Sequence, residues 1–128
     1  MRVTGGASMT NTRDGKFQQF NKYAVLIAEG CFINDEKHGE WKEYYDQSGS
    51  IMIEECYVNG INHGRFASYH PNGQLASEGA YVNGNREGYF QIFDENGKKA
   101  RTLLFINNNL IEDIEVNDAF NEKGKTTG

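Results

Sequence analysis

The sequence predicts an all-β fold: a single-layer antiparallel meander of β-hairpin repeats, with about 24 residues per repeat. The first observation behind this prediction is a motif, Gly-x-aromatic-x-x-aromatic, whose first aromatics lie 24, 25 and 24 residues apart. The motif begins at Gly15, Gly39, Gly64 and Gly88. The second observation is a series of Asn-Gly pairs between short apolar runs. A fixed period of this size is typical of a repeat array, in which each unit buries its apolar side chains only against its neighbours.

The Asn-Gly pairs predict two strands per repeat. Both residues of such a pair accept left-handed backbone dihedrals, so each pair is expected to form a two-residue hairpin turn. The pairs are Asn59-Gly60, Asn72-Gly73, Asn83-Gly84 and Asn96-Gly97. The first unit lacks a pair in its apolar run 23–27. The second has one extra residue between Tyr44 and Gly49, which we expect a bulge or a longer loop to absorb.

The two aromatics of the motif are three residues apart, so in a regular strand they face opposite sides of the sheet. We therefore expect two ladders of aromatic side chains instead of a conventional core. The return strand of each unit carries its own signature, Glu-x-x-aromatic. It reads Glu29/Phe32, Glu54/Tyr57 and Glu78/Tyr81, and the fourth unit keeps Phe105 but has Thr102 in place of the glutamate.

Three segments follow from the extent of the repeats. Residues 1–14 are expected to be a flexible N-terminal segment, 15–117 the repeat domain, and 118–128 a flexible C-terminal tail. Ile114 falls where a fifth first aromatic is due, and 110–116 reads as a closing strand whose charges protect the sheet edge. The sequence leaves open whether Met1 or Met9 is the start.

Composition excludes several functions. The net charge is −5 with no basic face, which argues against nucleic acid as a ligand. No apolar stretch approaches the roughly 20 residues of a membrane span, and the N-terminus lacks the apolar core of a signal peptide. We therefore expect a cytoplasmic protein. Cys31 and Cys56 occupy one slot in successive units, about 9–10 Å apart, too far for a disulfide, and are expected to be reduced, semi-buried thiols.

Few residues suggest chemistry. His38 and His63 share the slot before the repeat glycine, but no third ligand recurs beside them, so a turn-flanking role is favoured over a metal site. Glu29, Glu54 and Glu78 form a carboxylate ladder that we expect to pair with Lys or Arg on neighbouring strands. No nucleophile–base pair and no phosphate-cradling loop is evident, so we expect no enzyme activity, no cofactor and no metal.

Three residues are the candidate binding residues. Trp41, the only tryptophan, is either a ladder rung or the anchor for a partner. Tyr45 and His70 follow the second aromatic of their units and are expected to be exposed. Together they would lie on a partly exposed aromatic and polar face.

At the level of Gly-x-aromatic-x-x-aromatic, Asn-Gly and Glu-x-x-Tyr-x-Asn-Gly, the chain resembles the MORN-repeat proteins. It most resembles the bacterial MORN-variant repeat, whose units read much like 64–75 and 78–84. The resemblance covers roughly 15–107 and implies a stack of β-hairpins without catalytic residues. Variant repeats of this kind occur in a bacterial antitoxin family of the YwqK type. Classical MORN arrays are linked to acidic phospholipids and to partner docking.

Three functions therefore remain open. The first is a protein-binding module, in its narrower form an antitoxin that covers a basic toxin. The second is a peripheral membrane module that contacts acidic phospholipid, for which only the cluster Lys98, Lys99 and Arg101 argues, against the net charge. The third is a structural protein that self-associates through its open sheet edges. The charged last strand argues against open-ended polymerisation, so the expected state is a monomer or a closed dimer.

Overall fold

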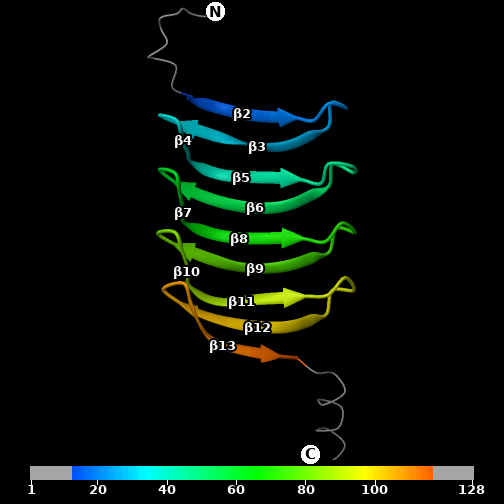
Figure 1. Ribbon diagram of the computed structural model, residues 1–128, viewed down its shortest axis with the longest axis vertical. Helices are drawn as coiled ribbons and strands as arrows, with labels where there is room; N and C mark the ends of the chain where they lie inside the picture. Colours follow the sequence, from blue (N-terminus) through cyan, green and yellow to red (C-terminus); the bar gives the residue numbers. More distant parts are fainter. Residues whose placement is uncertain (1–12, 117–128) are drawn as a thin grey trace, which may run out of the picture.

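Residues 13–116 of the computed structural model form one open antiparallel sheet, and they contain no helix. Figure 1 shows the strands stacked in chain order in a single layer. The main strands are β2 (Gly15–Phe20), β3 (Leu26–Ile33), β5 (Gly39–Tyr44), β6 (Ile51–Val58), β8 (Gly64–Tyr69), β9 (Leu75–Val82), β11 (Gly88–Phe93), β12 (Lys99–Ile106) and β13 (Asn109–Glu115). The predicted all-β meander is confirmed. The expectations for 1–12 and 117–128, including the choice between Met1 and Met9, lie outside the described residues.

Each of the later units also has a two-residue strand that was not predicted. These are β4 (Glu36–Lys37), β7 (Ile61–Asn62) and β10 (Asn85–Arg86), which pair with β3, β6 and β9 respectively. Each follows a tight turn and precedes the motif glycine, which has a left-handed φ of 83° at Gly39 and 116° at Gly64. The chain therefore makes a corner at this glycine before the next long strand begins, and a side chain would be strained there.

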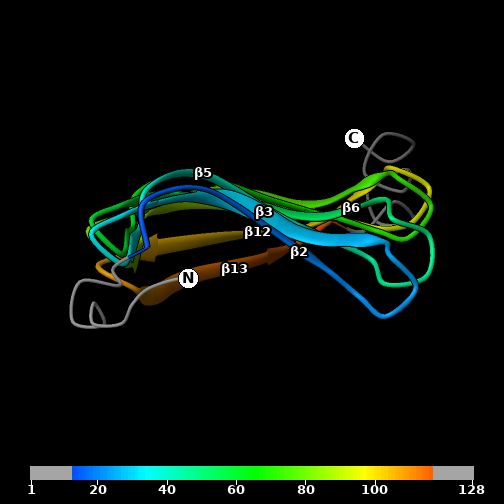
Figure 2. The same cartoon turned by 90° about the horizontal axis from the view of Figure 1, so that it is seen from above.

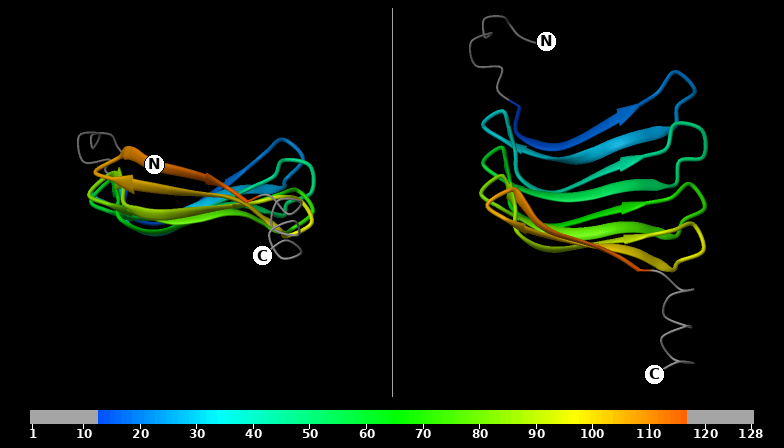
Figure 3. Two further views of the ribbon diagram at one scale, coloured as in Figure 1. Left: turned by 90° about the horizontal axis from the view of Figure 1, so that it is seen from below. Right: turned by 60° about the horizontal axis from the view of Figure 1, so that its bottom comes forward.

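Seen from above, the strands overlie one another as one thin, curved layer (Figure 2). The last strands, β12 and β13, run in a different direction from the first ones, as accumulated sheet twist requires (Figure 3). No described segment lies on either side of the layer. Both faces of the sheet and both of its edge strands, β2 and β13, are consequently available for contact.

Two kinds of turn alternate along the chain. On the left of Figure 1, at the margin we call the tight-turn margin, two-residue turns with left-handed φ at both positions occur at 34–35, 59–60, 83–84 and 107–108. The predicted two-residue turns are therefore confirmed at Asn59-Gly60 and Asn83-Gly84. At Asn72-Gly73 and Asn96-Gly97 the prediction is wrong, because only the glycine is left-handed. Asn72 Oδ1 there accepts a hydrogen bond from the backbone N–H of Gln74 (2.9 Å), which holds a wider loop.

The wider loops form the opposite margin, at the right of Figure 1. In the third unit the loop is closed by the His70 N–H, which donates to the Gln74 carbonyl (2.8 Å). The first unit makes the same loop without a glycine, because Ala24 takes the left-handed position at φ 65°. In the second unit the closing bond joins Tyr45 and Ser50 (2.8 Å), so the loop absorbs the extra residue, as expected.

The core consists mostly of rings on one side of the sheet, which we call the aromatic face. The fully buried Ala67 lies on the other side, where it pairs with Glu54 and Glu78. The aromatic face carries Phe17, Phe32, Trp41, Tyr57, Phe66, Tyr81, Phe90 and Phe105. The buried members are only 5–6% exposed and belong to the first, second and fourth units: Phe32, Trp41, Phe90 and Phe105. On the other side, the hydroxyls of Tyr44 and Tyr69 reach Glu29 and Glu54. The two motif aromatics therefore lie on opposite faces, as the sequence predicts.

The fifth unit departs from the sequence count. Ile114 pairs with Thr102, and Asp113 pairs with Leu103, which is the position that a first aromatic would face. The expectation that Ile114 occupies the aromatic slot is therefore wrong. In the earlier units the chain makes a wide corner at the motif glycine. In the fifth unit this corner is reduced to a one-residue irregularity in the pairing opposite Leu104 and Phe105, so the residues of β13 that follow are shifted by one position.

Candidate functional site

Basic side chains cover the aromatic face at regular positions. In the first, second and fourth units, the residue two before the motif glycine lies over a ring of the same unit. The Arg13 guanidinium carbon is 4.0 Å from the Phe32 ring centre, and that of Arg86 is 4.2 Å from Phe105. In the second unit, the Lys37 ammonium lies 4.7 Å from the Trp41 ring centre and 5.0 Å from that of Tyr57. These cation–π contacts cap the ring ladder with positive charge.

The third unit breaks this pattern. Its equivalent residue is Asn62, whose Nδ2 donates to Glu55 Oε1 (3.0 Å) instead of covering a ring. The same carboxylate accepts the Tyr57 hydroxyl (3.1 Å). Burial, followed by the nearby charge of Glu55, raises the pKa of Tyr57 to about 12. No cation of the described residues lies over Phe66 or Tyr81, and both rings are only half-buried.

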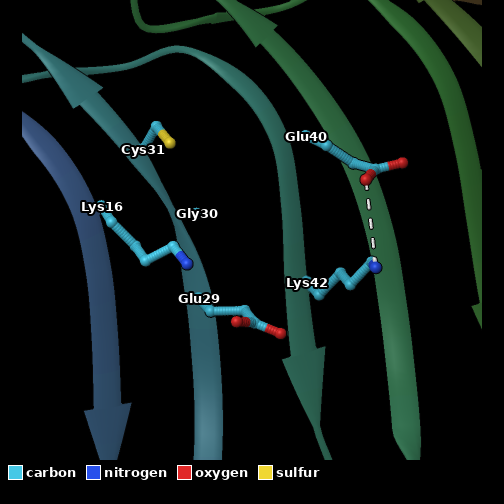
Figure 4. A pocket seen from close by; sticks show the side chains of 6 residues that line it. All are labelled: Lys16, Glu29, Gly30, Cys31, Glu40 and Lys42. Atoms are coloured by element: carbon cyan, nitrogen blue, oxygen red, sulfur yellow. Dashed lines mark ion pairs between the residues drawn. The ribbon is translucent and has the colours of Figure 1, made fainter.

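The opposite side, which we call the carboxylate face, is a polar network. Lys16, Glu29, Cys31, Glu40 and Lys42 rise from β2, β3 and β5 around one shallow pocket (Figure 4). Glu29 accepts the Tyr44 hydroxyl (2.5 Å), and this bond lowers the pKa of Glu29. Burial and the same carboxylate raise the pKa of Tyr44 to about 12.

The next carboxylates of this face use two kinds of partner. Glu54 accepts the hydroxyl of Tyr69 (2.7 Å) and lies 3.6 Å from Arg65, while Glu78 lies 3.5 Å from the same guanidinium. The predicted pairing with basic residues is therefore confirmed for Glu54 and Glu78. The tyrosine partners were not predicted, although Glu29 and Glu54 each precede a tyrosine of the next unit by 15 residues.

The slot before the motif glycine is a hydrogen-bond acceptor at every unit. Its side chain accepts the backbone N–H of the first tight-turn residue about twenty positions later. The four bonds are Asn34 to Asp14 (2.8 Å), Asn59 to His38 (3.4 Å), Asn83 to His63 (3.1 Å) and Asn107 to Glu87 (2.8 Å). The turn-flanking role predicted for His38 and His63 is therefore confirmed. Within 13–116, no three His, Cys, Asp or Glu side chains are grouped to hold a metal.

An apolar ridge runs along the tight-turn margin. It consists of branched side chains that are 42–51% exposed: Ile33, Val58, Ile61, Val82 and Ile106. Four of them end the long return strands, so they recur once per unit, about 10 Å apart. Val58 and Ile61 pair directly across the β6–β7 hairpin, which makes the ridge widest in the third unit. Sequence analysis missed this ridge, although an aliphatic residue before each tight turn was its signal.

The three predicted binding residues all have structural contacts. Trp41 is 5% exposed and donates from its indole N–H to the Cys31 carbonyl (3.0 Å), so it is the ladder rung of the two alternatives. The Tyr45 hydroxyl donates to the Tyr69 carbonyl (2.6 Å), and His70 Nε2 lies 2.9 Å from the Phe93 carbonyl. The expected exposure of Tyr45 and His70 is wrong, because both are half-buried between one loop and the next. The structure does not bring the three together.

The cysteines differ from each other. Cys56 is half-buried, as expected, but Cys31 is exposed on the carboxylate face beside Lys16. The Cys31 side chain is exposed because the sheet has one layer and because the neighbouring edge strand, β2, covers it only with the Lys16 side chain. None of the residues 13–116 forms a helix that could cross a membrane.

A single-layer array of hairpins with two open faces defines a repeat-based binding module. The family model described as the MORN repeat variant matches residues 37–59, 62–83 and 86–107, just over half of the chain. The chain therefore belongs to the MORN-repeat-variant family, whose members are generally non-enzymatic binding modules. No curated protein matches the chain. The first unit, with Ala24 in place of the loop glycine, lies outside the matched ranges.

Proposed function

We propose that the chain is a non-enzymatic module that binds a protein partner along its tight-turn margin. The observation that supports this is the apolar ridge, where four branched side chains in a periodic row, with Ile61 beside Val58, stay about half exposed. Exposed apolar side chains that line up in this way are typical of protein interaction sites, since a partner that covers them removes apolar area from water.

The site residues of this proposal are those of the ridge, with Val58 and Ile61 at its centre. Trp41 is a rung within the sheet, and Tyr45 and His70 lie in the wide loops at the opposite margin, so the proposal does not place these three residues in the contact with the partner. Their truncation would weaken binding only by disturbing the stacking of units. The partner is a basic protein, because the chain carries a net charge of −5 and opposite charges accelerate encounter.

The test is a comparison of two double variants. Val58→Ser with Val82→Ser removes two ridge side chains, whereas Ile111→Ser with Ile114→Ser removes two somewhat more exposed apolar side chains from the edge strand β13. Each is used to capture proteins from a lysate of the source cell, after circular dichroism has shown that it folds. We expect one stoichiometric partner that the β13 variant retains and the ridge variant loses. A partner lost only with the β13 variant would place docking at the sheet edge and contradict the proposal.

The antitoxin role is the narrower form of this proposal. It states that the partner is a toxin whose activity stops when the chain covers it. Co-expression of the captured partner with and without the chain tests it, with growth as the measurement. Growth inhibition that the chain does not relieve would exclude the antitoxin role and leave the binding module intact.

Lipid contact and self-association are the competing outcomes. Among the described basic residues, Arg13, Lys37 and Arg86 already lie over rings of the aromatic face, and Arg101 pairs with Asp113 (2.8 Å). An interaction with acidic phospholipid would therefore have to displace these contacts. Salt-sensitive cosedimentation with acidic vesicles, or a mass that rises with concentration, would each favour one of these alternatives over the proposal.

A further inference from the structure

The basic residues that lie over rings of the aromatic face form a series, one per unit, and the third unit lacks its member. We call this position, at Asn62, the vacancy. In the first, second and fourth units the residue two before the motif glycine is Arg13, Lys37 or Arg86, and each lies over a ring of its own unit. In the third unit this residue is Asn62, which is neutral and is bonded to Glu55. The ring that a cation there would cover is Tyr81, with Phe66 beside it at a centroid distance of 5.9 Å.

A carboxylate lies next to this vacancy. The register of β6 with β8 pairs Ile53 with Ser68 and Glu54 with Ala67, so the next residues, Glu55 and Phe66, lie side by side on the aromatic face. The other units have Gly30, Gly79 and Leu103 at the place of Glu55. The third unit thus has two half-buried rings, the Glu55 carboxylate of the second unit beside them, and no covering cation among the described residues. Rings and a carboxylate in this arrangement attract a cation.

We propose that the third unit is a receptor for a basic side chain, arginine or lysine, which the protein partner inserts over Tyr81 and Phe66 beside Glu55. The partner then supplies in trans the contact that the chain supplies to itself in its other units. Charge complementarity favours a basic occupant. At this position the third unit presents two aromatic rings and a carboxylate, whereas the other units already have a cation there. The proposal deepens the proposed function and rests on it only for the identity of the partner.

The position of the vacancy fits the docking margin. Asn62 follows Ile61 in β7 and pairs with Tyr57, while Ile61 pairs with Val58. Because neighbouring residues of a strand point to opposite sides, Asn62 faces the aromatic face and Ile61 the ridge. A partner that binds the tight-turn margin at the β6–β7 hairpin would therefore contact the ridge on one side of the sheet and the vacancy on the other.

The experiment uses a small probe and the full chain. N-acetylarginine amide is titrated into the protein, and the aromatic NMR signals of Phe66 and Tyr81 are followed. N-acetylcitrulline amide, which has the same shape without the charge, is the control. We expect saturable shifts at these two rings with arginine only, and smaller shifts at Phe32, whose ring Arg13 already covers. Shifts that are equal for both probes, or spread evenly over the rings, would overturn the proposal.

Two variants sharpen the result. Asn62→Arg gives the third unit its own cation and should abolish the arginine shifts, whereas Asn62→Gln should retain them. Glu55→Gln removes the carboxylate charge and should weaken binding about five-fold, a change of ~1 kcal/mol. Unchanged probe binding in Asn62→Arg would show that the rings are not the receptor. Because this titration needs no partner, an empty lysate capture would refute the proposed function alone, and a failed titration would refute this inference alone.

Discussion

The first two units and the last two units build the same ring cluster by the same rule. Phe17, Phe32, Trp41 and Tyr57 form one cluster, with ring centres 5.0–6.5 Å apart, and Phe66, Tyr81, Phe90 and Phe105 form the other, at 5.3–6.2 Å. In each cluster one ring lies on a glycine: Trp41 on Gly30 and Phe90 on Gly79. Between the clusters Glu55 takes the glycine position. The structural period is therefore a pair of units, although the sequence motif repeats every unit.

The two clusters differ in how they are capped. Both cation positions of the first cluster are filled, by Arg13 and Lys37, but only Arg86 caps the second. The difference teaches that ring packing and ring capping are separate properties of a unit. Packing depends on the residue after the ladder glutamate, and capping depends on the residue two before the motif glycine.

The largest expected effect comes from filling the glycine positions. A Cβ at Gly30 would lie 2.2 Å from the Trp41 ring, and one at Gly79 would lie 2.5 Å from Phe90. Gly30→Ala and Gly79→Ala must therefore displace a buried ring, and each should lower the free energy of unfolding by about 1–3 kcal/mol in urea titrations. Glu55→Ala, at the same slot between the clusters, is the control and should cost less. Equal effects at all three positions would contradict the paired period.

The carboxylate face supplies the next prediction. Tyr44→Phe and Tyr69→Phe each remove a hydroxyl that donates to a ladder glutamate, and each should destabilise the fold by about 1 kcal/mol. The fourth unit already has Phe93 in this slot, and Glu78 relies on Arg65 instead. Phe93→Tyr is therefore the matched control, and we expect no loss of stability from it. If Phe93→Tyr lost as much stability as the other two variants, the effect of the substitutions would come from ring packing and not from the hydrogen bond.

The tyrosine–glutamate bonds of Tyr44 and Tyr57 predict how stability depends on pH. The pKa of Tyr44 and of Tyr57 is raised from 10.0 to about 12, so their contribution is complete below pH 10 and is lost as the pH rises toward 12. The pKa of Glu29 is lowered, so its contribution is present above pH 4.5 and is lost on acidification. Urea midpoints measured across the range should therefore fall at both ends. Tyr44→Phe should reduce the decrease of the urea midpoint at both acid and alkaline pH. An unchanged pH dependence in this variant would refute the attribution of these decreases to the Tyr44–Glu29 bond.

Particular residues show how far the sequence could predict this structure. The period, the opposite placement of the two motif aromatics and the turn-flanking role of His38 follow from spacing and turn chemistry alone. The vacancy at Asn62 does not, because its meaning depends on which ring a side chain from another strand reaches. Ile114 was misplaced for a related reason: counting residues assumes that every corner keeps its length. Tyr45 and His70 were misassigned because their partners are backbone carbonyls of the next unit, which carry no sequence signal.

The smallest effect concerns the one wide loop without a glycine. Ala24 has a φ of 65°, a left-handed conformation that costs an L-residue roughly 1 kcal/mol and a glycine almost nothing. Ala24→Gly relieves this strain, but glycine also gains freedom in the unfolded chain, which offsets part of the gain, so we expect the fold to be stabilised by only about 0.5 kcal/mol. Gly73→Ala, at the equivalent position of the third unit with φ 93° and an open surrounding, is the reverse control and should destabilise by a similar or larger amount. If both substitutions destabilise, the alanine is held by contacts specific to the first unit, and the loops are not equivalent.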